Sequence, residues 1–376
     1  WSISTNTGEN LLDPGKTPAK NIQFLVFLMA VIKAVDEYAD LMRISAASAG
    51  NDHRLGGNEA PPAIVSIFLG DELTAILKSI EDDTYFGKHQ RVQLETGAHV
   101  LPHFIKDNTD RNRTSPFAFT GNKFEFRMLG SSASVATPNI ILNTAVAEAL
   151  AQFSRELSGT APKDMEHAVH ELIKRAIKKH KKVIFNGNGY TEEWVAEAEK
   201  RGLYNLASTP DCLPQILAEK NVDLFTRHHI FTREELASRY EIFLENYVKT
   251  VAIEAKTLRE MLAKDFLPAV SRYASSVSGE ALSMKTFVPD LSTDSAKKLV
   301  SFLGASYETI SGALDLLDQE ILALDEKTSL LEAADYCRKT ILATMEELRS
   351  AADQAEAKIP EEELPYPTYD ALLFSV

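Results

Sequence analysis

The stretch GNKFEFR, residues 121–127, alternates charged and aromatic side chains, which is typical of a β-strand. Because successive side chains of a strand point to opposite faces, Lys123, Glu125 and Arg127 share one face and the two phenylalanines share the other. Two interpretations are open for such a strand. It either belongs to an ordinary sheet with one solvent-exposed face, which is the commoner case, or it directs charge into a functional site. The neighbouring sequence has to distinguish them.

Composition places the chain among globular proteins. Of its 376 residues, 44% are hydrophobic and 25% are charged, which predicts one large domain or two moderate ones. The net charge of -14 argues against nonspecific binding to nucleic acid, because a phosphate backbone would be repelled. The longest apolar run, residues 24–32, is far shorter than the roughly 20 residues of a membrane span. We therefore expect neither nucleic acid nor membrane as a partner.

The two cysteines indicate a reducing compartment. Cys212 and Cys337 are far apart and have no metal-ligand spacing around them, so we expect buried or idle thiols. The chain begins at Trp1 without an initiator methionine or a charged and then apolar leader. We expect a piece of a longer protein that resides in the cytoplasm, and a location in an organelle stays open because the true N-terminus is expected to lie upstream.

The order of patterns along the chain predicts an α+β fold. Residues 21–48 follow helical spacing, and a loop rich in Gly, Asn and Pro follows at 49–62. Residues 64–69 are consistent with a strand, and 138–157 with a helix. We expect an antiparallel sheet with helices, followed by a mostly α-helical extension.

A Gly and Pro cluster at 158–164 separates this mixed structure from the helical remainder. The predicted domains are therefore residues 1–157 and residues 158–376. In the second domain, Thr232 and Glu235 have the spacing of a capping box.

Leucine and isoleucine recur every seven residues in the second domain, which predicts a long helix. These residues are Leu303, Ile310, Leu317, Leu324 and Leu331. A second apolar stripe follows over 334–352, so the two predict an antiparallel helical hairpin. Packing within the chain is the commoner use of such a stripe, and a surface for subunit assembly is the alternative.

Two histidine-containing patterns do not predict a metal site. The run HELIK, residues 170–174, has Lys174 where a zinc-protease motif needs its second histidine. His228 and His229 are adjacent, and adjacent side chains do not face one ligand, so we expect a solvated pair.

Charged residues gather in three segments of the first domain. They are Arg54 with Glu59, Arg111 with Arg113, and the charged face of residues 123–127. Arginines combined with glutamates indicate a site that binds carboxylates and phosphates through guanidinium groups, together with hard metal ions. This combination is typical of phosphoryl transfer.

The amino-acid sequences of these segments resemble those of the glutamine synthetases. The segment HRLGGNEAPP (residues 53–62) is similar to the family segment in which Arg-Leu precedes Glu-Ala-Pro. The segment RNRTSPFAF (111–119), followed by KFEFR (123–127), is similar to the family's Arg-Asn-Arg segment and its later Glu-x-Arg strand. Together with STNTGENLLDPG (4–15) and the helical extension, the resemblance is greatest to the type III enzymes.

The resemblance implies an enzyme that joins ammonia to L-glutamate at the expense of ATP, through a γ-glutamyl phosphate. It implies ATP with Mg²⁺ or Mn²⁺ as cofactors, and a homo-oligomer whose active sites form between subunits. Two alternatives remain open at this stage. One is another γ-glutamyl amine ligase of the same superfamily, and the other is a noncatalytic helical assembly module.

The resemblance also implies roles in catalysis and substrate binding. Arg54 matches an arginine that holds the substrate carboxylate, and Arg127 matches one that contacts glutamate and the transferring phosphoryl group. Glu59 matches a glutamate of a mobile loop that closes the site and helps to deprotonate ammonium. Arg113 matches an arginine that stabilises charge on the γ-phosphate.

The remaining implied roles concern nucleotide and metal. Ser2 and Lys123 match residues that contact ATP, and Arg113 matches one that contacts the γ-phosphate of ATP. Glu125 matches a metal-binding glutamate. The apolar PFAF segment stands where the family has a further arginine, which puts one nucleotide contact in doubt. The family's upstream metal-binding glutamates and its Gly-Ser-Gly-x-His segment are absent before Trp1. We therefore expect the chain to be the C-terminal portion of such an enzyme and to be inactive alone.

Overall fold

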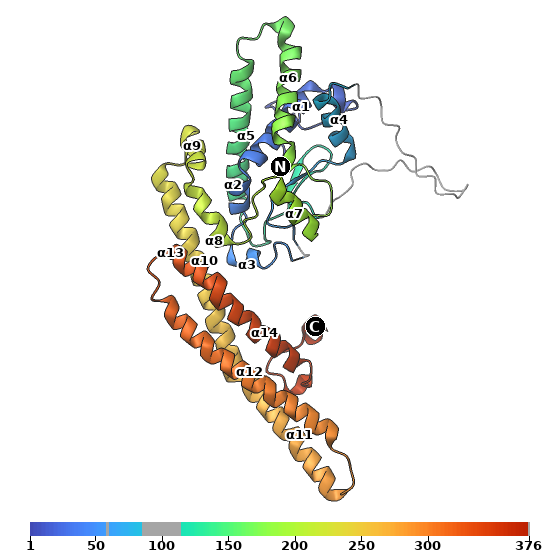
Figure 1. Ribbon diagram of the computed structural model, residues 1–376, viewed down its shortest axis with the longest axis vertical. Helices are drawn as coiled ribbons and strands as arrows, with labels where there is room; N and C mark the ends of the chain where they lie inside the picture. The colour runs from blue at the N-terminus through green and yellow to red at the C-terminus, as the bar shows by residue number, and fades with distance from the viewer. Residues whose placement is uncertain (58–59, 85–113, 375–376) are drawn as a thin grey trace, which may run out of the picture. The chain divides into compact units, whose positions relative to one another are not determined.

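The computed structural model describes residues 1–57, 60–84 and 114–374 (Figure 1). Its contacts divide the chain into two compact units, which we call unit 1, Trp1–Tyr240, and unit 2, Glu241–Val376.

The core of unit 1 is built around helix α1, Ile22–Glu37. Asn21 caps this helix, since its side chain accepts a hydrogen bond from the Phe24 main-chain nitrogen at 3.0 Å. Helix α1 packs on α5, Ala136–Leu157, and on α6, Met165–His180. The latter two run side by side in Figure 1. The predicted helix at 138–157 is confirmed.

The single helix predicted over 21–48 is wrong. The chain leaves helical conformation at Tyr38, with φ −121° and ψ 30°, and a second helix, α2, runs from Ala39–Ile44. Every residue of α2 is buried. The break lets this short helix pack on α8, Thr209–Cys212, and on η4, Leu213–Leu217, which come from far along the chain.

Three short strands form one sheet in the order β1, β2, β3. Strand β1 is Ile67–Phe68, β2 is Phe117–Phe119 and β3 is Phe124–Phe126. The antiparallel expectation holds for β2 with β3, where Ala118 pairs with Glu125, whereas β1 pairs with β2 in parallel. The sheet is therefore mixed, within an α+β architecture that is mostly helical.

The face assignment of β3 is confirmed. Phe124 is fully buried and stacks on Phe117 with ring centroids 4.7 Å apart, while Glu125 on the opposite face is exposed. The aromatic face thus anchors the strand in the core, and the charged face remains accessible.

The remaining elements of unit 1 are short. They are η1 Pro18–Lys20, α3 Ala49–Asp52, α4 Asp71–Glu81, η2 Pro162–Asp164, η3 Lys181–Val183, α7 Glu192–Lys200, α8 Thr209–Cys212, η4 Leu213–Leu217 and α9 Glu219–Arg227.

The compact units divide at Tyr240, whereas the composition changes at 158–164. The reason is that α6, which follows the change in composition, packs on α1 and α4 from before it, and α9 packs on α5. The change in composition marks the point after which the chain is helical. The first helices after that point nevertheless pack on the helices of the first segment, and therefore belong to the compact unit that contains the sheet.

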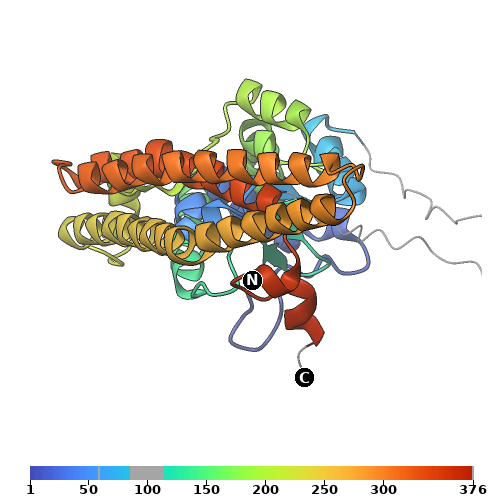
Figure 2. The ribbon, with the colours of Figure 1, turned by 90° about the horizontal axis from the view of Figure 1, so that it is seen from below.

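Unit 2 is built of long helices joined by shorter helical elements. They are α10 Arg233–Met261, which begins in unit 1, the π-helical turn η5 Leu262–Phe266, α11 Leu267–Phe287, α12 Asp294–Leu324, α13 Leu330–Tyr336, the π-helical turn η6 Cys337–Ile341, α14 Leu342–Glu356, η7 Glu361–Glu363 and α15 Tyr369–Phe374. Helix α12 packs on α11 and on α14, and Figure 2 shows the long helices lying alongside one another.

Both local predictions for this region are confirmed. Thr232 and Glu235 form a capping box at the start of α10, with bonds of 2.8 and 3.2 Å between the side chain of each and the main-chain nitrogen of the other. Leu303, Ile310 and Leu317 are fully buried on α12, so this part of the stripe packs within the chain. The helix ends at Leu324, however, so Leu331, the last residue of the predicted stripe, lies on α13 and not on the same helix. No helix in the described ranges is long and apolar enough to cross a membrane.

Candidate functional site

The N-terminal segment lies against β3. The main-chain nitrogen of Trp1 donates to the Phe124 carbonyl oxygen at 2.7 Å, and the Phe124 nitrogen donates to the Trp1 carbonyl oxygen at 2.8 Å. This exchange places Ser2 beside the strand that carries Lys123 and Glu125. All three of these side chains are exposed. Ser2 and Lys123, two of the predicted nucleotide-contacting residues, are 121 positions apart in sequence and therefore lie on adjacent segments.

Glu125 and Arg127 form an ion pair on the charged face. The Arg127 Nη2 atom donates to Glu125 Oε2 at 2.9 Å, and Nε donates to the same oxygen at 3.3 Å. The hydrogen bond from Arg127 holds the pKa of the Glu125 carboxyl below its usual value. Glu125 is therefore ionised at neutral pH. Its side chain keeps 45% of its surface exposed, which leaves it accessible to a bound cation.

Arg54 lies at the exit of β3. Its Nη1 atom donates to Asn51 Oδ1 at 2.7 Å and is 3.4 Å from the carbonyl oxygen of Leu129, two residues after Arg127. Helix α3, whose N-cap Ser48 accepts from the Asn51 nitrogen at 3.2 Å, sets the direction in which the chain leaves toward Arg54. The structure thus brings Arg54 to the same end of the sheet as Arg127.

Two predicted catalytic residues, Glu59 and Arg113, lie outside the described residues. The described main chain on either side of residues 58–59 is joined, since the Gly56 nitrogen donates to Pro61 oxygen at 3.2 Å and Leu55 bridges Ala60. Gly56 has φ +77°, a conformation that other residues rarely adopt. The described residues that flank positions 58 and 59 are therefore held close to one another.

The described residues do not complete a metal site. Glu125 offers one accessible carboxylate, but no group of three His, Cys, Asp or Glu side chains placed to hold a metal ion occurs among residues 1–57, 60–84 and 114–374. A hard divalent cation takes six or more oxygen ligands in proteins. Further ligands to a cation at Glu125 would have to come from outside these residues.

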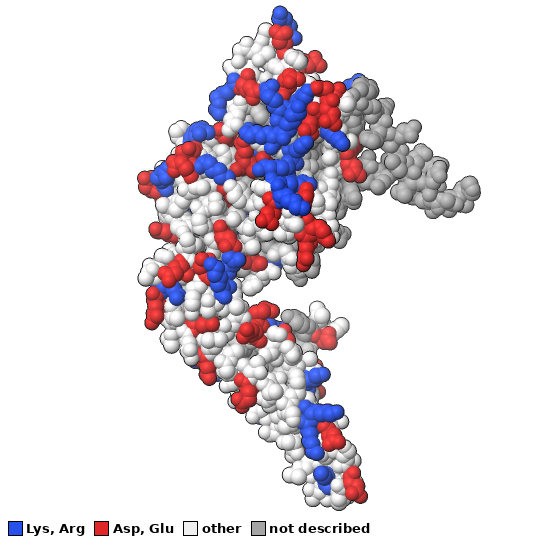
Figure 3. All heavy atoms as spheres, viewed as in Figure 1, with Lys and Arg blue, Asp and Glu red and all other residues white. Residues whose placement is uncertain are grey.

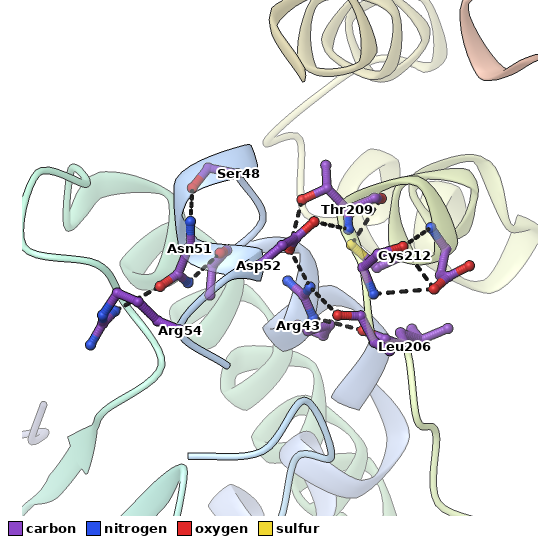
Figure 4. Close-up of polar contacts among 12 residues, drawn as sticks. Arg43, Ser48, Asn51, Asp52, Arg54, Leu206, Thr209 and Cys212 are labelled. Carbon is purple, nitrogen blue, oxygen red and sulfur yellow. Dashed lines mark hydrogen bonds and ion pairs between the residues drawn. The ribbon is translucent and has the colours of Figure 1, made fainter. Parts of the chain in front are cut away.

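A buried polar network behind the site was not predicted from the sequence (Figure 4). Arg43 on α2 is 1% exposed and its Nη2 atom lies 2.8 Å from Asp52 Oδ1. Asp52 also accepts from the Thr209 main-chain nitrogen at 2.6 Å. Burial raises the pKa of the Asp52 carboxyl, and the charge of Arg43 and the bonds from Thr209 offset part of that rise. The sequence offers only one signal, an Asn-Asp pair directly before His53 and Arg54, and none pointing to Thr209.

The expectation of a solvated histidine pair is wrong for His228. Its Nε2 atom lies 2.8 Å from Oε2 of Glu148, whose side chain on α5 is 1% exposed, and Arg227 Nη1 lies 2.7 Å from the other carboxylate oxygen. His228 thus acts in packing α9 on α5.

Lysine and arginine side chains gather over α6 and η3 (Figure 3). Acidic side chains from neighbouring helices lie among them. Lys181 pairs with Glu81 at 2.7 Å, and Lys182 with Asp36 at 3.6 Å. This positive surface is therefore partly neutralised by the chain itself.

Comparisons with known proteins agree with the motifs. Residues 168–285 match the family model described as the glutamine synthetase C-terminal domain. All of the chain aligns at 48% identity with a glutamine synthetase of Butyrivibrio fibrisolvens. The chain is homologous to glutamine synthetases. It is also 40% identical to the type-3 glutamine synthetase of Dictyostelium discoideum and 36% identical to a glutamine synthetase of Bacteroides fragilis, again along its whole length.

The chain spans about half the length of the relatives it matches. It covers 53%, 52% and 53% of the Butyrivibrio, Dictyostelium and Bacteroides proteins. The predicted resemblance to glutamine synthetases, the type III proteins included, is thereby confirmed. The family model begins after the predicted domain boundary at 157 and crosses the division of the compact units at Tyr240.

Proposed function

We propose that this chain is the C-terminal part of a type III glutamine synthetase, which ligates ammonia to L-glutamate through a γ-glutamyl phosphate formed from ATP. Similarity to three glutamine synthetases along the whole chain supports the family. The observation that carries the site is the gathering of Ser2, Lys123, Glu125, Arg127 and Arg54 around β3. These residues come from three segments that are distant in sequence.

The two arginines supply the positive charge that this reaction needs. Transfer of a phosphoryl group to a carboxylate brings two anions together, and preorganised cations stabilise the negative charge that develops. In this proposal Arg54 binds a carboxylate of glutamate, and Arg127 contacts glutamate and the transferring phosphoryl group. The pairing of Arg127 with Glu125 restricts the guanidinium to one orientation.

The proposed roles of Glu59 and Arg113 rest on the motifs alone. Ammonium becomes a nucleophile only after it loses a proton, and Glu59 is the proposed base. Arg113 is proposed to stabilise charge on the γ-phosphate.

Nucleotide and metal complete the proposal. Ser2 and Lys123, together with Arg113, are proposed to contact ATP. Glu125 is proposed to supply one ligand to Mg²⁺ or Mn²⁺, which would neutralise phosphate charge when bound. The remaining ligands would come from parts of the protein that the described residues do not include, so we expect the chain to be inactive alone.

We further propose a cytoplasmic homo-oligomer in which the site is completed between subunits. Support comes from large apolar side chains that are exposed on the helices of unit 2, among them Ile253, Leu282, Phe287 and Leu322. Contact with another subunit would remove such side chains from water, which is favourable. Sedimentation of the complete protein tests this point.

The enzymatic proposal is tested in the complete protein that carries this chain. Glutamine formation is measured with glutamate, ammonia and ATP for the wild type and for Arg127→Ala. Loss of one preorganised charge-stabilising group is expected to lower kcat by about 10²- to 10³-fold. The matched control is Arg233→Ala, because Arg233 also forms an exposed ion pair, with Glu219 at 2.7 Å, but lies away from β3.

Two results would contradict the proposal. If Arg127→Ala and Arg233→Ala retained equal activity, the site assignment would fail. If the wild type used an organic amine far better than ammonia in the same assay, with a γ-glutamyl amide as product, the chain would belong to another amine ligase of the superfamily.

A further inference from the structure

Two consecutive residues of α3 point in opposite directions. Figure 4 shows Asn51 directed toward Arg54, while Asp52 is directed toward Arg43 and Thr209. The family motifs single out Arg54 and Glu59 and assign nothing to Asn51 or Asp52. Both residues make several hydrogen bonds at or near the base of the candidate site.

Asn51 is buried, with 4% of its surface exposed, and its amide joins three segments. The Nδ2 atom donates to the Ala46 carbonyl oxygen at 2.7 Å and to the Met128 carbonyl oxygen at 2.8 Å. The Oδ1 atom accepts from Arg54 Nη1 at 2.7 Å. Because an amide nitrogen carries two hydrogens, both are used on carbonyls, and the oxygen has to face Arg54.

Met128 directly follows Arg127. One amide therefore bonds the guanidinium of Arg54 and the main chain adjacent to Arg127. This arrangement fixes the separation of the two arginines that are proposed to bind glutamate.

The other side of α3 is held by charge. Asp52 pairs with Arg43 at 2.8 Å and accepts from the Thr209 hydroxyl at 3.0 Å, in addition to the Thr209 nitrogen. Arg43 in turn donates to the Leu206 carbonyl oxygen at 2.8 Å. The helix that carries Asn51 is thus attached to the chain around α8, and Asn51 has a rigid base from which to hold Arg54.

We propose that Asn51 is a positioning residue that orients Arg54 relative to Arg127 for binding the substrate carboxylate. This inference rests on the proposed function. A neutral amide suits the task because it holds the guanidinium without neutralising its charge, which stays available to an anionic substrate. A carboxylate at position 51 would pair with Arg54, compete with glutamate and face the two carbonyl oxygens without donors.

The test is a double-mutant cycle in the complete protein, with Asn51→Ala, Arg54→Ala and the combination. Misplacement of a binding group by about 1 Å costs roughly 10²-fold in rate, so we expect Asn51→Ala to lower kcat/KM for glutamate by about 10- to 100-fold. The loss should fall mainly on KM for glutamate, with KM for ATP changing less than about twofold. Because Asn51 acts through Arg54, adding Asn51→Ala to Arg54→Ala should change kcat/KM by less than about twofold.

Asn221→Ala is the matched control. Asn221 is also a fully buried asparagine of unit 1 whose amide nitrogen donates twice, to Asp40 Oδ2 at 2.8 Å and to the Gln215 carbonyl oxygen at 2.7 Å. Its loss should lower stability about as much as Asn51→Ala does, and leave KM for glutamate unchanged. If Asn51→Ala does not yield folded protein, Asn51→Ser enters the same cycle.

The outcomes are distinguishable. Suppose that the wild type is active. If the effects of Asn51→Ala and Arg54→Ala on kcat/KM then multiply independently, or if Asn221→Ala raises KM for glutamate as much as Asn51→Ala does, only the positioning role of Asn51 is contradicted. A wild type that forms no glutamine contradicts the proposed function and removes this inference with it.

Discussion

Units 1 and 2 bury different kinds of side chain. Unit 1 encloses charged and hydrogen-bonding groups, among them Asp40, Arg43, Asn51, Glu148 and His180. In the described part of unit 2 the buried side chains are aliphatic, aromatic or cysteine apart from Glu320 and Thr344, whose side chains bond each other at 2.9 Å. One unit is therefore held by specific polar contacts as well as by its core, and the other by an apolar seam.

The difference corresponds to what each unit has to do. Placing Arg54 beside the exit of β3 needs directional bonds, because an apolar contact does not orient a guanidinium. Aligning long helices needs only residues of suitable size at regular spacing. Replacing buried polar residues should consequently lower the free energy of unfolding strongly in unit 1 and little in unit 2.

The largest effect is expected for Asp52→Ala in unit 1. Arg43, 1% exposed, would keep its main-chain carbonyl partners but lose its carboxylate, and breaking a buried ion pair from one side costs about 3–5 kcal/mol. Urea unfolding at neutral pH measures the free energy of unfolding, and hydrogen exchange should locate the loss in α2, α3 and α8. A change below about 1 kcal/mol would show that this network does not stabilise unit 1.

A pH-dependent effect of intermediate size is expected at Glu148. Burial raises the pKa of this carboxyl, but hydrogen bonds from Gln152 and His228, with the charge of Arg227, outweigh burial and leave the pKa lowered. Since the folded pKa lies below the unfolded value of about 4.3, the stabilisation is complete above that pH and is lost as the pH falls through the folded pKa.

The comparison for this effect is Glu148→Gln, which keeps the shape and removes the titration. The free energy of unfolding of the wild type should fall faster than that of the variant below about pH 4.3, by at most about 1.4 kcal/mol per pH unit. Urea midpoints collected between neutral and acidic pH give the two curves. Curves that stay parallel over this range would mean that Glu148 is not stabilised in its ionised form.

The smallest effect, and the one of opposite sign, is expected in unit 2. Glu320 Oε2 has no hydrogen-bond partner among the described residues, so its carboxylate is incompletely satisfied. Replacing both members of the pair, Glu320→Leu with Thr344→Val, should raise the free energy of unfolding by about 1 kcal/mol. Leu317→Ala, on the same helix, is the control for sensitivity and should lower it by about 2–5 kcal/mol. A loss of stability in the double variant would remove the contrast between the units.

Patterns confined to short windows were predictable. The alternation in residues 123–127, the capping box at Thr232 and the heptads of α12 each depend on neighbours within a turn or a pleat, and the structure has all three. The motifs around Arg54 and β3 also indicated the glutamine synthetases before any contact was known. Local side-chain patterns therefore predicted these elements of secondary structure, and the sequence motifs predicted the family.

Contacts between distant segments were not predictable. Asn51 meets Met128 across 77 positions, and Asp52 meets Thr209 across 157. The division of the compact units at Tyr240 and the contact of His228 with the buried Glu148 are of the same kind. The sequence alone determines which charged and polar side chains are present. Only the tertiary structure decides which of them form hydrogen bonds, because a hydrogen bond needs donor and acceptor within about 3 Å, and only the folded chain brings distant residues that close.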